Sequence, residues 1–480
     1  MAPAKTTAMK YTPVIGLEVH VELKTMSKMF CRCSADYFGK EPNTHTCPVC
    51  LGLPGALPVA NAKAIEWCIM IALSLNCEIN LLSKFDRKNY FYPDLAKGYQ
   101  ISQYDLPFGK NGSIELKSGK KIRIRRVHME EDTAKLTHGQ LGDQNSELSA
   151  KGGSAPSGKS QNNEKVSLID FNRSGVPLVE IVTEPDFSEA GEVKEYLQKL
   201  QQIVRYLDVS NADMEKGDMR LEPNISLQVT RNTPHEGKNV SPVTSHELPS
   251  YKVEVKNINS FRFVEKAINF EVKRQEDILE KGQSPVQETR GWSEIKNQTV
   301  SQRLKEEAND YRYFPEPDIP PIRHTKEQIS TLLSRMPELP DAKYSRFLRE
   351  FSLNDYDTEI LTREKSLADF FEEAVRVGKD HSVTPKQIAN TLINKKVDPS
   401  SSEPASIVKQ IVQSGQVTSI KEEELEKIVT DVLESNQKAV GDYKSGKETA
   451  IMFLVGQVMR QFTTKIDASV VKETIKRRLS

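Results

Sequence analysis

Four of the six cysteines lie close together as two pairs, Cys31 with Cys33 and Cys47 with Cys50. Each pair can offer two thiolates to one side of a metal ion, and two such pairs complete the tetrahedron that Zn²⁺ prefers. Two disulfides or a cluster of buried thiols are the alternatives, but CxC and CxxC spacing in an intracellular chain favours a metal. Because all four thiolates would serve as ligands, the pattern predicts a structural zinc site.

A second group with possible chemistry comes just before the cysteines. Glu18, His20 and Glu22 alternate with Val19 and Val21, which is the period of a β-strand, so the three polar side chains share one face. Carboxylate oxygens with one imidazole form a suitable platform for Mg²⁺, an ion that usually shares its coordination sphere with water and phosphates. A strand face that simply contacts solvent is the alternative.

Further acidic residues recur on other predicted strands. One basic strand ends in three consecutive acids, and such close carboxylates require a cation or basic side chains nearby. Two other strands alternate charged and apolar residues, so each has one apolar and one polar face. Polar faces of this kind could converge on a site for a metal ion and a nucleotide. The residues are Glu130, Glu131 and Asp132, then Asp218, Arg220, Glu222 and Asn224, then Glu254 and Lys256.

Basic and aromatic residues are interleaved between these acidic strands. Residues 84–126 contain eleven Lys or Arg against four Asp or Glu, and they include Lys88, Tyr90, Tyr99 and Tyr104. Basic side chains contact sugar-phosphate and aromatic rings stack on unpaired bases, as at the end of a tRNA. A purely structural aromatic cluster is the competing explanation.

The composition limits the class of protein. The chain has 480 residues, room for about two to four domains. Lys plus Arg and Asp plus Glu both number 67, so the whole chain has no charge that would attract nucleic acid or membrane. The longest apolar run, residues 69–75, is too short to cross a bilayer, and the N-terminus has no apolar signal core. We expect a cytoplasmic enzyme or assembly subunit, and an organellar location stays open.

The pattern of secondary structure predicts an α+β body over residues 10–322, with a zinc knuckle at 31–50. Short alternating strands at 15–23, 121–129, 219–228 and 252–257 mix with helices beginning near Ser188 and near Ser260. The absence of a regular βαβ period argues for an antiparallel sheet. Residues 139–165 have the composition of a flexible insertion, and a proline run at 315–321 predicts an extended linker.

Beyond the body the sequence becomes helical, polar and poor in strands. We expect an all-α domain over residues 323–400 and an all-α tail over 401–480, separated by a Pro/Ser-rich stretch. From Lys438 to the C-terminus there are nine Lys or Arg against four Asp or Glu. A local basic face of this kind can bind phosphates, although a pair of solvated helices fits the charge equally well.

Long segments of the chain closely resemble the B subunit of the glutamine-dependent aspartyl/glutamyl-tRNA amidotransferase. The resemblance extends over nearly the whole chain from Tyr11 onward, and motifs this long and numerous exclude chance similarity. The segments are IGLEVHVELKTMSKMF, CPVCLGLPGALPVAN, KNYFYPD, VHMEEDTAK, LIDFNRSGVPLVEIVTEPD, VEVKNINSF and DYRYFPEPDIPP, with GDYKSGK and FLVGQVM in the tail.

The resemblance implies a body with a glutamine-synthetase-like antiparallel sheet, a helical domain and a tail that binds tRNA. It also implies the reaction. ATP phosphorylates the side-chain carboxylate of a misacylated Glu-tRNA(Gln) or Asp-tRNA(Asn), and ammonia then displaces phosphate to give the amide. Phosphoryl transfer mainly requires Mg²⁺, carboxylates that hold it and cations around the phosphates, which agrees with the residues described above.

The resemblance also assigns site residues. Glu18 and His20 match metal positions of the family, and three further acids match acidic positions of the site, so all five are expected to hold magnesium and to serve catalysis. The chain departs from the family at two of the acidic positions. The family usually has Asp where this chain has Glu222, and a second acid where this chain has Lys216. The acids are Glu131, Glu222 and Glu254, and the expected substrate-binding residues are Lys88, Tyr90 and Arg220.

The source of ammonia is absent from the sequence. No Gly/Ser-rich core suited to an amidase-type serine nucleophile stands out, and the cysteines are assigned to zinc or to an apolar helix. The family therefore implies two partner subunits, one a glutaminase of the amidase type and the other a small bridging protein.

A zinc-ribbon RNA-binding scaffold would leave the recurring carboxylates unexplained. A free-standing amide ligase for a small amino acid would leave the tail unexplained.

Overall fold

The computed structural model describes residues 9–140, 165–231, 248–304, 311–415, 422–462 and 468–479. Most of the predicted insertion at 139–165 lies outside these residues. The chain forms two compact units, residues 1–339 and 340–480, and each is described by itself. Within the described residues, no helix is both long and apolar enough to cross a membrane.

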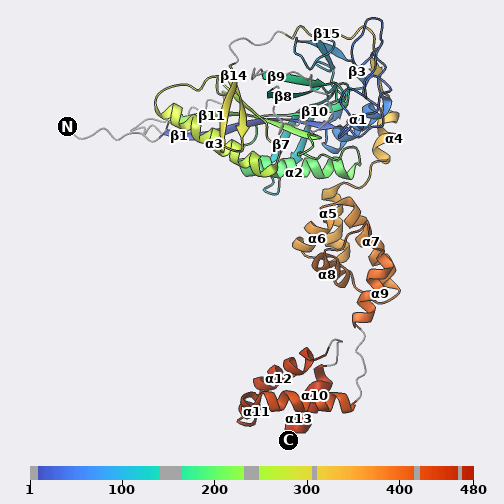
Figure 1. Cartoon of the computed structure of the whole chain (residues 1–480), viewed down its shortest axis with the longest axis vertical. Helices are drawn as coiled ribbons and strands as arrows, with labels where there is room; N and C mark the ends of the chain where they lie inside the picture. Colours follow the sequence, from blue (N-terminus) through green and yellow to red (C-terminus); the bar gives the residue numbers. More distant parts are fainter. Residues whose placement is uncertain are drawn as a thin grey trace, which may run out of the picture. The chain divides into compact units, whose positions relative to one another are not determined.

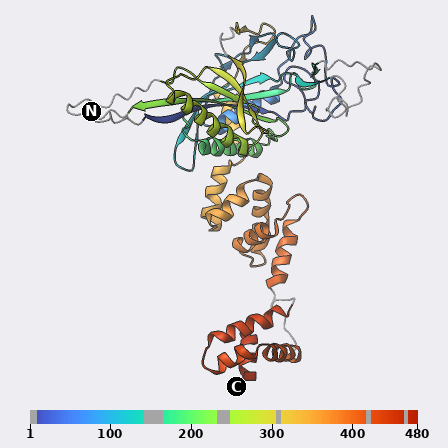
Figure 2. The same ribbon diagram turned by 60° about the vertical axis from the view of Figure 1, so that its left-hand side comes forward.

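The first unit is built on a sheet of nine strands (Figure 1). Every neighbouring pair in the sheet is antiparallel except β12 with β13, which confirms the predicted antiparallel α+β body. Figure 2 shows the outer ends of β1 and β11 running out together as a two-stranded ribbon. In spatial order the strands are β14 Gln298–Leu304, β13 Glu288–Ser293, β12 Val253–Lys256, β11 Met219–Arg231, β1 Met9–Glu22, β10 Pro177–Thr183, β7 Lys121–Glu131, β6 Gly109–Glu115 and β2 Glu78–Ile79.

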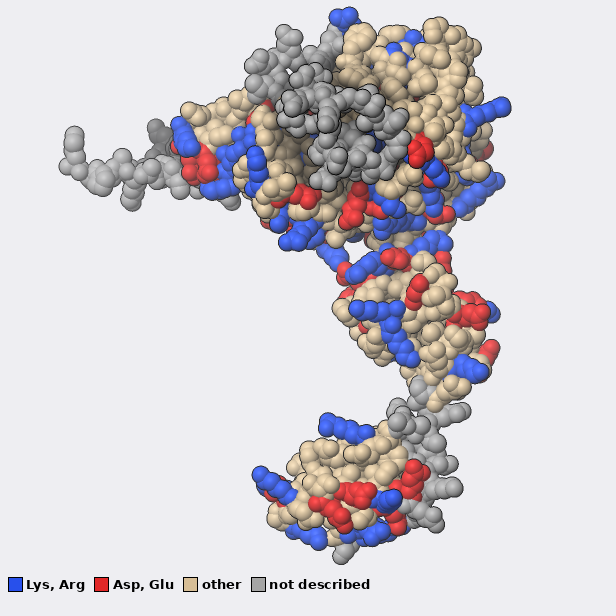
Figure 3. Space-filling view, in the orientation of Figure 1, with Lys and Arg blue, Asp and Glu red and all other residues tan. Residues whose placement is uncertain are grey.

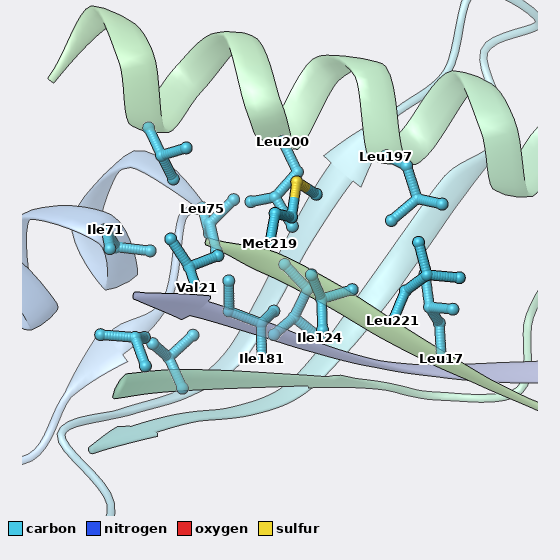
Figure 4. Close-up of a cluster of buried hydrophobic side chains, with 14 of the residues drawn as sticks. Leu17, Val21, Ile71, Leu75, Ile124, Ile181, Leu197, Leu200, Met219 and Leu221 are labelled. Carbon is cyan, nitrogen blue, oxygen red and sulfur yellow. The ribbon is translucent and has the colours of Figure 1, made fainter. Parts of the chain in front are cut away.

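Helices cover one face of this sheet and bury its apolar residues. They are α1 (Ala62–Ser74), α2 (Ala190–Tyr206) and α3 (Phe261–Glu280). Leu197 and Leu200 of α2 pack over Leu17 and Leu221 of the strands, as Figure 4 shows. Because side chains alternate along a strand, burying the odd-numbered residues of β1 turns its even-numbered residues to the opposite face.

The first residues of two of these helices test the predicted helix starts near Ser188 and Ser260. The helix predicted to begin near Ser260 does so, and Ser260 is its N-cap, because its side chain accepts a hydrogen bond from Phe263 N. The prediction of Ser188 as the N-cap of α2 is wrong, because the cap position is Glu189. Ser188 instead donates its backbone N–H to the Glu192 carboxylate at 2.8 Å, which anchors the chain just before the helix.

Small sheets extend the first unit. The proline run, expected to be a linker, is part of this unit, because β15 pairs with β4 and the buried Glu316 makes two hydrogen bonds with Arg87, at 2.6 and 2.8 Å. The unit ends with α4 (Lys326–Ser334). The strands concerned are β3 Leu82–Ser83, β4 Asp86–Asn89, β5 Tyr99–Ser102, β8 Lys135–Gln140, β9 Lys165–Asp170, β15 Phe314–Pro315 and β16 Ile322–Arg323.

The second unit is helical throughout its described residues and has two separate hydrophobic cores. The first core includes Ile407 and Val408 of α9, beyond the expected domain boundary at residue 400. On the face that Figure 3 shows, acidic side chains gather across the middle of the C-terminal part, with basic side chains above and below. The three-domain division stays a prediction. The helices are α5 Pro340–Phe351, α6 Asp355–Thr362, α7 Lys365–Lys379, α8 Pro385–Lys395, α9 Pro404–Gly415, α10 Glu422–Ser435, α11 Gln437–Lys444, α12 Thr449–Arg460 and α13 Ala468–Leu479.

Candidate catalytic face and metal sites

The face of the large sheet opposite α1–α3 carries a compact group of metal-ligating side chains, which we call the central group. His20 on β1 lies opposite Glu180 on β10, and Glu130 comes from the next strand, β7. The Nε2 atom of His20 is 3.6 Å from Glu130 Oε1 and 3.6 Å from Glu180 Oε2. One ligand atom from each of the three residues lies within 4.8 Å of the others, a spacing that suits a single cation.

The central group concentrates negative charge in a buried place. Glu130 and Glu180 are 3% and 6% exposed, and His128 Nε2 lies 3.1 Å from Glu180 Oε2. Burial alone would lower the pKa of His20, but the nearby carboxylates of Glu180 and Glu130 raise that pKa to about 9. With no metal bound, His20 at this pKa is protonated and offsets only part of the charge of the two carboxylates. A divalent cation that displaces the proton fits this donor set and keeps open positions for water or phosphate.

Lys88 supplies a basic side chain beside the central group. Burial by itself would lower the pKa of Lys88, yet Glu130 and Glu180 together with nearby tyrosines raise it above its usual value. The Nζ atom lies 5.1 Å from the ring centre of Tyr311 and 5.9 Å from that of Tyr90. The structure thus brings Lys88 and Tyr90, two of the expected substrate-binding residues, to the same place.

A second set of carboxylates lies beside the central group, towards β12. Glu18 and Glu222 are opposite each other on β1 and β11. Lys256 Nζ lies 3.0 Å from Glu222 Oε2 and 3.1 Å from Glu254 Oε1, so this lysine already neutralises part of their charge. Glu18 accepts a hydrogen bond from Asn224 at 3.0 Å and lines a cavity of about 280 Å³. Four of the five expected magnesium residues therefore share this sheet face, in two neighbouring sets.

Arg220 is opposite His20 on β11, but its guanidinium belongs to a separate ion-pair network. It contacts Asp132, and its Nη2 lies 3.5 Å from Glu22 Oε1. Arg173 Nε is 3.6 Å from the same Asp132 carboxylate. These acidic and basic side chains thus pair mainly with one another.

Glu131, the fifth expected magnesium residue, lies apart from the other four. It is the last residue of β7, and the alternation of side chains turns it away from Glu130. Lys97 Nζ lies 2.6 Å from its carboxylate, and the backbone N–H of Ile101 donates to it at 2.9 Å. This ion pair lines a cavity of about 200 Å³ that also touches Cys31.

Sequence reasoning assigned no role to Glu180 and His128 and chose Glu131 in place of Glu130. A signal for Glu180 is present, since one acid interrupts the apolar run Val179, Ile181 and Val182, and period-two alternation puts it on the polar face. The same alternation separates Glu130 from Glu131.

The four cysteines form the second metal group. Their Sγ atoms lie within 4.8 Å of one another, and all six cysteines of the chain are free, with no disulfide. Gly52 follows the second pair with φ +66, a conformation that favours glycine, and a Cβ atom at this position would collide with the side chain of Lys97. Four converging thiols without a disulfide fit the tetrahedral zinc site that the spacing predicts. The ligands are Cys31, Cys33, Cys47 and Cys50.

An antiparallel α+β body with a carboxylate-rich face and a four-cysteine group therefore characterises the first unit. Residues 13–330 match the family model described as the GatB/GatE catalytic domain, and residues 383–479 match the one described as the GatB domain. The chain belongs to the GatB family, whose members include the B subunit of aspartyl/glutamyl-tRNA(Asn/Gln) amidotransferase.

Curated relatives named as that B subunit align along almost their whole length. The relative from Thermotoga petrophila is 44% identical, and the alignment covers 98% of this chain and 99% of the relative. The relatives from Thermosipho melanesiensis and Thermoanaerobacter pseudethanolicus are 43% and 42% identical, each with 98% of this chain and 100% of the relative covered.

Proposed function

We propose that this chain uses ATP to convert the side-chain carboxylate of a tRNA-bound glutamate or aspartate into an amide. The observation that supports this best is the central group, in which His20 lies between the buried carboxylates of Glu130 and Glu180 with Lys88 beside them. A cation site with a neighbouring lysine suits phosphoryl transfer, which depends mostly on positioning and charge stabilisation. The name of the relatives supplies the substrate class.

The proposed reaction has two steps. An oxygen of the substrate carboxylate attacks the γ-phosphorus of ATP, the bond to the β–γ bridging oxygen breaks, and ADP leaves. The nitrogen of ammonia then attacks the acyl carbon, and the C–O bond to phosphate breaks. One proton of the ammonia passes to the released phosphate or to solvent, and the amide remains on the tRNA.

Each named residue has a proposed role in this reaction. His20, Glu130 and Glu180 would hold Mg²⁺, which supplies neutralisation of the phosphate charge when bound. Glu18, Glu222 and Glu254 would keep the adjacent part of the face negative and take further cation or water contacts. Lys88 and Tyr90 would contact the phosphates and the end of the tRNA. Arg220 would act indirectly, because its closest described partner is Asp132.

Partners follow from the chemistry of ammonia and from the relatives' name, which describes one component of a larger assembly. Cys68 and Cys77 are buried, and burial raises the pKa of the Cys68 thiol, so neither is a suitable glutaminase nucleophile. We therefore propose that a separate glutaminase of the amidase type provides ammonia, that a small third protein joins the two, and that the assembly works in the cytoplasm. A closed passage between these proteins would protect ammonia from protonation in water.

The remaining proposals concern the zinc and the tail. The four-cysteine group would hold structural zinc, since no ligand position stays open for chemistry. Residues 401–480 would bind the body of the tRNA through their basic side chains, because contacts to phosphate dominate affinity for nucleic acid. The tail would then supply affinity and leave the chemical step to the first unit.

The test uses the full-length chain with its partner proteins, misacylated tRNA and ammonium salt as nitrogen donor. We expect His20→Ala to lower the amidation rate by at least about 100-fold, because the cation that stabilises phosphate charge loses a ligand. Binding of tRNA should change little. His381→Ala is the matched control, because this histidine is exposed and lies in the other unit.

Direct measurement of Mn²⁺ binding adds a readout that does not depend on turnover. We expect His20→Ala and Glu180→Gln each to weaken Mn²⁺ binding at least about tenfold, while the His381 variant binds normally. Near-normal amidation by His20→Ala at saturating Mg²⁺ would place the reaction elsewhere.

A further inference from the structure

Four tyrosines from distant parts of the first unit form a continuous group, which we call the tyrosine group. The rings of Tyr104 and Tyr313 are stacked, with centroids 4.3 Å apart and an angle of 14° between their planes. Tyr311 lies edge-on to Tyr313 at 6.1 Å and to Tyr90 at 5.9 Å. The proposed function uses only Tyr90 of these four, so the stacked pair has no role yet.

Tyr104 of the stacked pair is open to solvent although its backbone is held in place. Tyr104 is 55% exposed. Its backbone N–H donates to Asp86 Oδ2 at 3.2 Å, and the neighbouring Gln103 side chain is buried and bonds to the backbone of Lys84 and Met129. A rigid backbone that presents an exposed ring loses little conformational entropy on binding, which is the arrangement expected of a contact surface.

Tyr313 is fixed from the other side of the stack. The residues that follow it, Phe314 and Pro315, pair with β4, and the bidentate contact between Glu316 and Arg87 anchors this pairing. One face of the Tyr104 ring therefore rests on a supported ring, while more than half of the residue stays exposed to solvent.

The tyrosine group leads directly to the central group. Lys88 Nζ lies 5.1 Å from the ring centre of Tyr311, and its charge is stabilised by Glu130 and Glu180. Through Tyr313 and Tyr311, the tyrosine group thus connects the exposed ring of Tyr104 with the lysine beside the candidate cation site. The surrounding stretch, residues 84–126, has eleven Lys or Arg against four Asp or Glu, which favours a polyanion.

We propose that Tyr104, supported by Tyr313, stacks on the unpaired purine base at the 3′ end of the tRNA. This inference rests on the proposed function and extends it. The amino acid is esterified to the ribose of that last nucleotide, so holding the base positions the side-chain carboxylate near Lys88. Aromatic rings recognise unpaired bases in this way, and stacking tolerates any base because every base has a π-face.

The exposure of Tyr104 favours a tRNA end over the adenine of ATP as the group that stacks on this ring. Small-molecule ligands are usually enclosed by their site, whereas Tyr104 is more than half exposed. The cavity of about 280 Å³ beside Glu18 offers a concave place for a small ligand. A tRNA that is held elsewhere along its length needs only an open contact to fix its last base.

The test is a double-mutant cycle between the protein and the RNA. The dissociation constant is measured for the full-length chain with its partner proteins, using a complete uncharged tRNA and the same tRNA without its terminal nucleotide. We expect removal of the nucleotide to weaken binding about tenfold, or about 1.4 kcal/mol, in the unmodified protein. In Tyr104→Ala the complete tRNA should already bind about tenfold more weakly, and removal should then cost less than about twofold.

Two further variants separate stacking from general damage. Tyr104→Phe keeps the ring and should behave as the unmodified protein does. Tyr356→Ala removes another exposed tyrosine, 69% accessible, from the other unit and should leave the effect of removing the nucleotide intact.

Two results would overturn the inference. One is an equal loss of tRNA affinity, in the unmodified protein and in Tyr104→Ala, when the terminal nucleotide is removed. The other is a Tyr104→Ala variant that binds both forms of the tRNA as the unmodified protein does but has a KM for ATP raised about tenfold. That result would mean that Tyr104 stacks on the adenine of ATP. The tRNA cycle does not depend on turnover, so failure here is distinguishable from failure of the proposed function, which His20→Ala tests.

Discussion

The Nζ atom of Lys28 lies 3.8 Å from the Sγ atom of Cys50, in a lysine side chain with no exposure to solvent. The same ammonium group donates a hydrogen bond to the carbonyl oxygen of His45 at 2.7 Å. A buried lysine is costly unless it is paired, and Zn²⁺ with four thiolates carries a net negative charge. Lys28 is therefore placed to balance the charge of a zinc site.

We predict one tightly bound zinc per chain, measurable by elemental analysis of the purified protein. In Lys28→Met, zinc should pass to a chelator at least about tenfold faster, because groups next to the ligands typically change metal affinity about 10- to 100-fold. Lys63→Met, at an exposed lysine of α1, is the control and should release zinc normally. A folded, active chain without zinc would contradict the prediction.

Glu130 and Glu131 are neighbours in sequence with different expected behaviour. Glu130→Gln should weaken Mn²⁺ binding at least about tenfold, because Glu130 faces His20. Glu131→Gln should leave Mn²⁺ binding within about twofold and instead lower the free energy of unfolding, because the ion pair with Lys97 is buried. Breaking such a pair costs about 3–5 kcal/mol when one charge remains.

Titration with Mn²⁺ and denaturant unfolding would separate the two glutamates. If Glu131→Gln lost Mn²⁺ binding while its free energy of unfolding stayed unchanged, Glu131 would have to be a metal ligand. Lys97→Met is the partner substitution, and the double variant with Glu131→Gln should be less destabilised than the sum of the single variants.

A second buried network supports the edge of the sheet that carries Glu254. Glu271 of α3 is fully buried, and its carboxylate accepts hydrogen bonds from Arg274 at 2.6 Å and from Thr299 at 2.9 Å. Glu271→Ala would leave Arg290, 3.5 Å away, with less compensation in a buried position. We expect the free energy of unfolding to fall by about 3–5 kcal/mol.

Urea unfolding measured by circular dichroism would test this, with Glu276→Ala on the same helix as the control. Glu276 pairs at the surface with Lys273, at 3.6 Å, so its loss should change stability by less than about 1 kcal/mol. Equal effects of the two substitutions would contradict the role given to Glu271.

The C-terminal core can be removed as a unit, since its buried residues between Leu425 and Ile475 form a cluster of their own. We expect a chain ending at residue 421 to show a KM for misacylated tRNA raised at least about tenfold, with ammonia-supported turnover at saturating tRNA reduced much less. Binding of the unmodified protein should also weaken steeply with salt. A truncated chain that binds tRNA as tightly as the full-length one would refute the role proposed for the tail.

Local patterns predicted much of this protein. Alternation along single strands was enough to predict that Glu18 and His20 share one face, and the spacing of cysteines was enough to predict that four thiols converge. These features depend only on residues close in sequence, where backbone geometry fixes which side chains meet. The antiparallel α+β body was predicted in the same way and is confirmed.

The tertiary structure decided which strands lie side by side. His20 meets Glu180 only because β10 pairs with β1, and Tyr104 meets Tyr313 only because β15 pairs with β4. Such pairings join residues far apart in sequence, and they depend on how α1–α3 bury the apolar face, which no local pattern contains. For the same reason the sequence could not tell which of Glu130 and Glu131 faces the site. One step along β7 reverses the direction of a side chain, and only the packed sheet determines which direction leads to the site.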